Sequence, residues 1–149
     1  MKLIIAGSRD FTNYRLLEDQ ITFLIPDVTE VVCGCARGAD ELGHRWAISH
    51  GKDVKMFPAK WDNHGRAAGP IRNAEMADYA DQAAIFCKNK SPGSMNMIKA
   101  MKLRKKWFIA VHLSGDDIIT KTETVGYDPR YILGNEFYWG PDVGNEIIK

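Results

Sequence analysis

The stretch Lys2-Leu-Ile-Ile-Ala-Gly-Ser-Arg-Asp10 opens the chain and indicates how it folds. Residues 2–6 form a short, largely apolar run without polar alternation, which is typical of a strand buried on both faces of a parallel sheet. Gly7 then allows the backbone to turn sharply before a helical pattern begins. The arrangement recurs where Thr29-Glu-Val-Val-Cys33 precedes Gly34-Cys-Ala-Arg-Gly-Ala-Asp40. Both stretches predict strand, turn and helix units of an α/β fold.

Strand and helix patterns go on alternating as far as residue 111. We expect further strands at 53–57, 82–87 and 106–111, and helices at 13–25, 40–50, 67–79 and 94–105. This order predicts a Rossmann-like, doubly wound and mainly parallel sheet of about five strands and four helices. Ligands bind such sheets beyond the carboxyl ends of the strands, near the point where the strand order reverses.

Each of the first two turns combines a glycine with an arginine. The helix that starts after such a turn has amide groups without helical partners, and these amides hold phosphate or carboxylate well. Arg9 and Arg37 could add a bidentate grip on phosphate oxygens. The alternative is that both arginines are solvated turn residues, and that Ser8 and Asp40 are helix caps.

A third loop, Pro58 to Met76, has the composition of a binding site, because it holds two arginines, a histidine, an asparagine and a tryptophan. A fourth, Lys88 to Met97, places serines, a glycine and an asparagine before a helix, although ordinary capping explains that composition equally well. All four loops follow strands, so we expect them at one edge of the sheet as an anion-binding rim. Arg9, Arg37 and Arg72 are expected to converge on one anion.

Composition sets limits on the possible partners. The chain has 149 residues, which is the size of one domain, and its formal net charge of +1 and pI near 7.7 predict no bulk attraction to nucleic acid or an anionic membrane. No apolar stretch approaches the roughly 20 residues that span a bilayer, and we expect a soluble, cytoplasmic protein. The three cysteines are expected to be reduced and the four histidines are scattered, which predicts no metal site and no cofactor.

Taken together, the motifs resemble a known family. They are Gly-Ser-Arg at 7–9, Gly-x-Ala-x-Gly-Ala-Asp at 34–40, Gly-Arg-Ala-Ala-Gly-Pro-x-Arg-Asn at 65–73 and Pro-Gly-Ser-x-Asn-Met at 92–97. Residues 1–111 resemble the SLOG superfamily, in its small YspA/YpsA-related branch found in phages and bacteria. The resemblance implies a Rossmann-like fold that binds nucleotides or nucleotide-derived ligands. Relatives include the Lonely Guy phosphoribohydrolases, sensor domains of antiviral effectors and the DNA-processing protein A family, which binds single-stranded DNA.

The resemblance also implies which residues meet the ligand. Each group comes from one of the four loops. Gly7, Ser8 and Arg9 would lie beside the ligand; Gly34, Arg37, Gly38 and Asp40 would form a second wall; Arg66, Arg72 and Asn73 would approach phosphate or ribose; and Gly93, Ser94 and Asn96 would cradle the phosphate.

One position departs from the phosphoribohydrolase pattern Pro-Gly-Gly-x-Gly-Thr-x-x-Glu. Ala100 stands where that pattern has its glutamate, the carboxylate that assists N-glycosidic cleavage. Glu75 and Asp10 could substitute, or could be a solvated helix position and a turn residue. General acid–base assistance contributes about 10² to 10⁴ in rate, so its loss favours a binding protein. The alternatives are an N-glycosidic hydrolase acting on a nucleotide, and a single-stranded nucleic-acid binder, which the near-neutral charge disfavours.

Residues 112–149 lie outside the family motifs. This extension contains Gly115 and further glycines at 126, 134, 140 and 144, with aromatic residues at 127, 131 and 137–139, which is too aromatic for a disordered linker. We expect short strands that pack on the core or on a second subunit, in a homo-oligomer built on a two-fold dimer. Tyr138 and Trp139 could alternatively close the pocket by stacking on a nucleobase.

Overall fold

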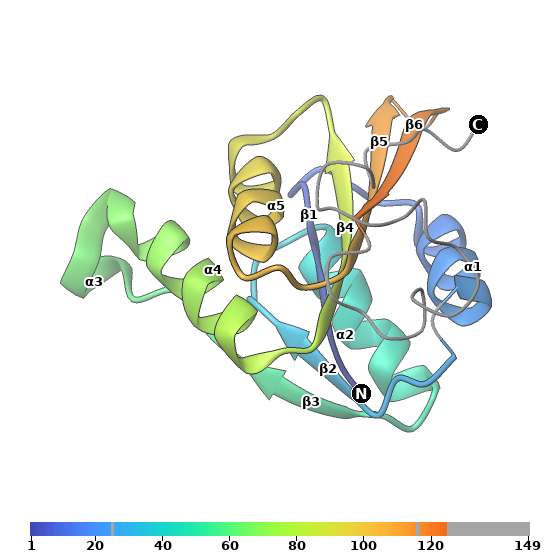
Figure 1. The fold of residues 1–149 in the computed structure, drawn as a ribbon, viewed down its shortest axis with the longest axis horizontal. Coiled ribbons are helices and arrows are strands. Elements are labelled where there is room, and N and C mark those ends of the chain that lie inside the picture. The colour runs from blue at the N-terminus through green and yellow to red at the C-terminus, as the bar shows by residue number, and fades with distance from the viewer. Residues whose placement is uncertain (25, 116, 125–149) are drawn as a thin grey trace.

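The computed structural model describes residues 1–24, 26–115 and 117–124, and the glycines and aromatic residues from Gly126 onward lie outside these ranges. Six strands form one sheet in the order β3-β2-β1-β4-β5-β6 (Figure 1). The strands are β1 (Lys2–Gly7), β2 (Glu30–Cys33), β3 (Asp53–Met56), β4 (Gln82–Lys88), β5 (Phe108–Ser114) and β6 (Asp117–Thr124). The first five are parallel, and β6 pairs antiparallel with β5.

Two pairs of helices cover the two faces of the sheet. The first pair is α1 (Tyr14–Leu24) and α2 (Ala39–Ser49), and the second is α4 (Ala68–Tyr79) and α5 (Pro92–Leu103). Along β1, Leu3 and Ile5 belong to the core of the first pair, whereas Ile4 and Ala6 belong to the core of the second. Successive side chains of a strand point to opposite faces, so β1 is apolar throughout because both of its faces are buried.

The order of the strands confirms the predicted Rossmann-like, mainly parallel sheet. The chain winds outward from β1 through β2 to β3, then returns to place β4 on the other side of β1. The helix after β1 lies on one face and the helix after β4 on the other. The loops that follow β1 and β4 therefore diverge, and this is the point at which ligands bind in such folds.

The segment before α4 contains helical structure that the sequence did not predict. Residues Trp61–His64 form a one-turn helix, α3, and Gly65–Ala67 form a 3₁₀ turn, η1. Neither contains a buried residue, and α3 lies at the end of the molecule farthest from α1 (Figure 1). A segment with so little buried apolar surface is held mainly by its own backbone hydrogen bonds.

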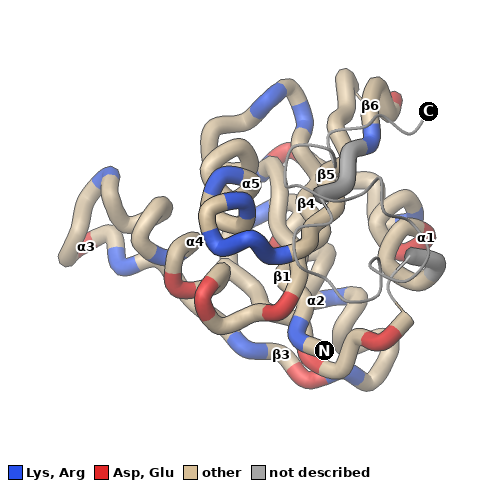
Figure 2. Tube along the Cα trace, in the orientation of Figure 1, with Lys and Arg blue, Asp and Glu red and all other residues tan. Residues whose placement is uncertain are grey.

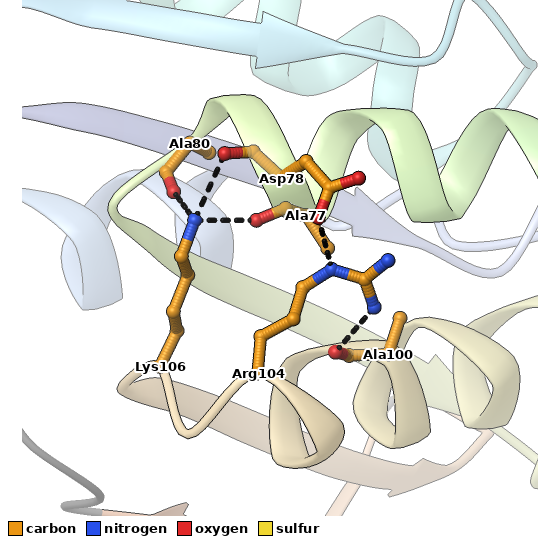
Figure 3. A network of polar contacts seen from close by, with 6 residues as sticks. All are labelled: Ala77, Asp78, Ala80, Ala100, Arg104 and Lys106. Carbon is orange, nitrogen blue, oxygen red and sulfur yellow. Dashed lines mark hydrogen bonds and ion pairs between the residues drawn. The ribbon is translucent and has the colours of Figure 1, made fainter.

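The far ends of α4 and α5 are tied together by two basic side chains (Figure 3). Lys106 Nζ donates to the carbonyl oxygens of Ala77 (2.7 Å), Asp78 (3.0 Å) and Ala80 (2.7 Å) at the end of α4. Arg104 Nε donates to Asp78 Oδ1 at 2.6 Å, and its Nη1 donates to the Ala100 carbonyl. A cation that satisfies the last carbonyls of a helix also complements its dipole. The network therefore anchors the C-terminal end of α4.

The predicted boundary at residue 111 falls inside β5, which runs to Ser114, and Gly115 takes a positive φ of 62° before β6. β6 supplies β structure in the extension, where short strands were predicted. Within the described ranges, no helix has the length and apolar character needed to cross a membrane.

Candidate functional site

A cleft of about 570 Å³ opens beyond the carboxyl ends of β1 and β4. The loops after these strands and the start of α4 form most of its wall, and residues of the loop after β2, α2, α3 and η1 complete it. Ten of the residues predicted to meet a ligand line this cleft. They are Gly7, Ser8, Arg9, Asp40, Arg66, Arg72, Asn73, Gly93, Ser94 and Asn96.

Three serine hydroxyls form a chain along the wall where β1 and β4 diverge. Ser8 Oγ lies 2.7 Å from Ser91 Oγ, which lies 2.6 Å from Ser94 Oγ. Ser8 and Ser94 are buried, and Ser8 Oγ accepts the Lys88 amide at 2.7 Å. Ser91 is the residue before α5, whose first helical residue is Pro92. All three serines line the cleft beside the start of α5, whose first amides lack helical partners, and this combination suits an anion.

Asn73 connects α4 to the start of α5. Its Nδ2 donates to the Gly93 carbonyl at 3.3 Å and to Asn96 Oδ1 at 2.9 Å. Its Oδ1 accepts Arg72 Nε at 3.1 Å. Asn73 is buried, so these contacts fix the side chains on both sides of the cleft rather than leaving them to adapt.

Arg72 is held by backbone carbonyls from two other loops. Its Nη1 donates to the carbonyl oxygens of Gly34, after β2, and Phe57, after β3. A Cβ on Gly34 would lie 2.6 Å from Arg72 Nη1 and 2.7 Å from Asp40 Oδ2, so a larger residue there would displace one or both side chains. Arg72 therefore organises the loops as well as carrying charge into the cleft.

Asp40 is a buried carboxyl in the cleft wall. Its Oδ2 accepts the Ala36 amide at 3.2 Å, and the Gly7 amide also donates to the carboxylate. Burial raises the pKa of Asp40, while the Ala36 hydrogen bond and the charges of Arg72 and Arg9 oppose that rise. These contacts join the loops after β1 and β2, a role that the capping alternative did not anticipate.

A smaller cleft of about 290 Å³ adjoins the first, and the two share Arg9, Ala36, Trp61 and Arg72. Gly34 and Arg37 line this smaller cleft and are absent from the wall of the larger one. All three arginines that were predicted to converge, Arg9, Arg37 and Arg72, line the smaller cleft.

Gly38 lines neither cleft. It is buried with a φ of +75°, and a Cβ there would overlap the carbonyl oxygens of Ser8 and Arg9. The glycine is thus required by close packing of the loops after β1 and β2.

Two wall residues, Ser91 and Trp61, lie in loops that the sequence singled out but were not among the residues expected to contact the ligand. The proline at the first position of α5 marks Ser91 as the residue just before this helix, and that signal could have identified it. Trp61 lines both clefts and is 49% exposed. Its position depends on α3, which the pattern of the sequence did not indicate.

The candidate catalytic groups are placed differently from one another. Asp10 lines the larger cleft, whereas Glu75 is exposed on α4 and lines neither cleft. Ala100 lies on α5 itself and is buried in the core. Burial raises the pKa of the Cys33 thiol to about 12, so this thiol stays protonated at neutral pH. Among the described residues, no three His, Cys, Asp or Glu side chains are grouped as metal ligands would be.

Two comparisons relate the chain to known proteins. Residues 1–64 match the model of the YspA, cpYpsA-related SLOG family, YAcAr. The chain is also 32% identical over 107 residues to the Gene 61 protein of Mycobacterium phage D29, a match that covers 66% of this chain and 86% of the phage protein. No solved structure matches the chain.

Proposed function

We propose that this chain, which belongs to the YspA, cpYpsA-related SLOG family, binds a phosphorylated nucleotide or a nucleotide-derived ligand in the larger cleft. Family membership suggests a role in binding or processing a nucleotide-related ligand. The observation that carries the finer proposal is the meeting of the Ser8, Ser91 and Ser94 hydroxyls with the start of α5 on one wall of the cleft.

The phosphate is assigned to that wall because helix amides and hydroxyls donate hydrogen bonds to phosphate oxygens without adding charge. Arg9 and Arg66 supply the positive charge, since both line the cleft and neither forms an ion pair with another described residue. Met76, Met97 and Pro70 contribute apolar surface to the same cleft. Such surface suits the base or ribose of a nucleotide, because small-molecule sites combine apolar walls with a few oriented polar groups.

Calorimetric titration with the 5′-monophosphates of adenosine, guanosine, cytidine and uridine tests the proposal. At least one should bind, and Arg66→Ala should weaken it by about 1.5–3 kcal/mol through loss of a charge-assisted contact. Arg15→Ala is the matched control, because Arg15 is exposed on α1 and lines neither cleft. Equal affinity of wild type and Arg66→Ala would place the phosphate elsewhere.

An N-glycosidic hydrolase is the second candidate, and the position of Asp10 on the cleft wall is the observation in its favour. Binding without efficient turnover remains the first choice because alanine occupies position 100. Chromatography of the incubated nucleotides separates the two functions. Intact nucleotides after hours support a binding protein, while free base that disappears in Asp10→Asn would establish an enzyme.

Single-stranded nucleic acid is the weakest candidate. Lys and Arg are concentrated along α5 and the turn after it (Figure 2). Of these, Arg104 and Lys106 are engaged with α4 at the end of α5 away from the cleft. A groove for a strand would need free positive charge continuous with the binding site.

A homo-oligomer is proposed on compositional grounds, because residues 112–149 are rich in aromatic side chains that suit a symmetric apolar contact. Light scattering over a range of concentrations tests it. A monomer mass at every concentration would count against it.

A further inference from the structure

We propose that the smaller cleft is an anion subsite for a second phosphate group, so that the preferred ligand is a nucleotide with two phosphates rather than one. The inference rests on the proposed function, because it takes the first phosphate to lie at the start of α5. It concerns the wall formed by the loop after β2 and by Pro58 and Ala59 after β3.

The charge on this wall is the first observation. Arg9, Arg37 and Arg72 all line the smaller cleft, and its wall contains no Asp or Glu. Within the described residues, neither Arg9 nor Arg37 forms an ion pair. Three guanidinium groups around one depression repel one another, and a bound anion would remove that cost.

The carboxylate of Asp40, which interacts with the charges of Arg72 and Arg9, offsets only part of the positive charge of this wall. It is 5% exposed, faces the larger cleft, and is occupied by the Ala36 and Gly7 amides. One buried carboxylate also leaves an excess of positive charge beside three arginines. The smaller cleft therefore has the charge that suits a phosphate.

The second observation is that Arg72 is already oriented. Its Nη1 and Nε are held by Gly34, Phe57 and Asn73, and no hydrogen bond from its Nη2 to another described residue is present. A guanidinium that is fixed before binding loses little conformational entropy when it donates to a ligand.

The third observation is the continuity of the two clefts. They share Arg9, Trp61 and Arg72, so one molecule can occupy both. Asn73 links Arg72 to Gly93 and Asn96 at the start of α5, where the first phosphate is assigned. A nucleoside diphosphate, or a dinucleotide joined by a pyrophosphate, has phosphates spaced for such adjoining positions.

Arg37 provides the decisive variant, because it lines only the smaller cleft, is exposed, and forms no ion pair with another described residue that the substitution would remove. Calorimetry would compare the 5′-monophosphate and 5′-diphosphate of each common nucleoside with wild type, Arg37→Ala and the control Arg15→Ala. We expect the diphosphate to bind wild type at least tenfold more tightly than the monophosphate. Arg37→Ala should remove most of that tenfold advantage and leave monophosphate affinity unchanged.

The outcomes separate the two proposals. Monophosphate binding with no gain from the second phosphate, or an equal effect of Arg37→Ala on both ligands, would overturn the subsite and leave the proposed function standing. Absence of binding by every nucleotide would overturn both. Retention of the diphosphate advantage in Arg37→Ala would also exclude the smaller cleft as its source.

Discussion

Ser8 Oγ lies 2.7 Å from Ser91 Oγ, and this contact joins the loops after β1 and β4 at the point where they diverge. Ser8 Oγ also accepts the Lys88 amide, and the side chain is buried. Ser8→Ala would leave that amide without its acceptor, so we expect the free energy of unfolding to fall by about 1–3 kcal/mol. Urea denaturation measures the loss. Ser49→Ala is the control, since Ser49 is exposed at the end of α2, and a fall of similar size in both variants would contradict the assigned role.

Gly38 and Gly51 allow steric overlap to be separated from backbone strain. Their φ values are +75° and +65°, but a Cβ on Gly51 meets no atom within 4 Å, whereas one on Gly38 overlaps the carbonyl oxygens of Ser8 and Arg9. Gly51→Ala should cost about 1–2 kcal/mol from left-handed strain alone. Gly38→Ala should cost about 1–3 kcal/mol more, because the loops must shift. Equal thermal and urea stability of the two variants would show that the loops do not pack as described.

Asp40 gives an expected pH dependence. Burial raises its pKa above the ordinary value of 3.8, so the folded state binds a proton that the unfolded state releases. The resulting stabilisation is fully present below the ordinary pKa and is lost as pH rises through the folded-state pKa. Wild type should therefore lose stability relative to Asp40→Asn as pH increases from about 4. Urea unfolding across this range measures the difference. Asp19→Asn, on the exposed side of α1, should show no such trend, and parallel profiles for wild type and Asp40→Asn would refute the burial effect.

Lys106 and Lys105 form a second matched pair. Lys106 Nζ satisfies three carbonyls at the end of α4, whereas Lys105 is exposed. Lys106→Met should lower the free energy of unfolding by about 1–3 kcal/mol, because those carbonyls lose a charged donor. Lys105→Met should change it by less than about 0.5 kcal/mol. Equal denaturation midpoints for Lys106→Met and Lys105→Met would show that the network in Figure 3 does not stabilise the fold.

The buried strands could be predicted from the sequence because their evidence is local. Residues 2–6 and 29–33 are largely apolar runs, and each forms a largely buried strand. The limits of both strands lie within one residue of the predicted ones. β5 was predicted from Lys106 but begins at Phe108, because Lys105 takes a positive φ of 55° and Lys106 turns to meet the end of α4. A contact across 29 residues of chain leaves no periodic signal in the sequence.

The candidate site could be predicted less completely, because it too depends on contacts between residues far apart in the sequence. The glycine and arginine turns after β1 and β2 were expected at the carboxyl edge of the sheet and lie there, since that depends only on parallel topology. The division of those arginines between two clefts depends on Arg72, which reaches a carbonyl 38 residues away. Likewise, the requirement for Gly38 arises from the backbone of Ser8 and Arg9, which no pattern around residue 38 encodes.

The segment from Trp61 to Ala67 should become ordered when a ligand binds. All seven residues are exposed in the free protein, yet Trp61 lines both clefts and Arg66 lines the larger one. Local opening needs little free energy where few apolar contacts must break, so amide hydrogen exchange in this segment should be fast without ligand. A bound nucleotide would give Arg66 an anion and Trp61 a surface to pack on, and exchange should slow.

Tryptophan fluorescence gives an independent measure of the same change. Trp46 and Trp107 are buried, so an emission change on titration with the tightest-binding nucleotide should come from Trp61 among the described tryptophans. In a Trp139→Phe background, which removes the tryptophan outside the described residues, Trp61→Phe should abolish that change while calorimetry still detects binding, because the phosphate contacts are made by other residues. Exchange at Trp46 and Ala47, which are buried on α2 and line neither cleft, serves as the internal control and should stay constant. If nucleotide binds with neither slower exchange at 61–67 nor altered emission, α3 is a fixed projection and takes no part in holding the ligand.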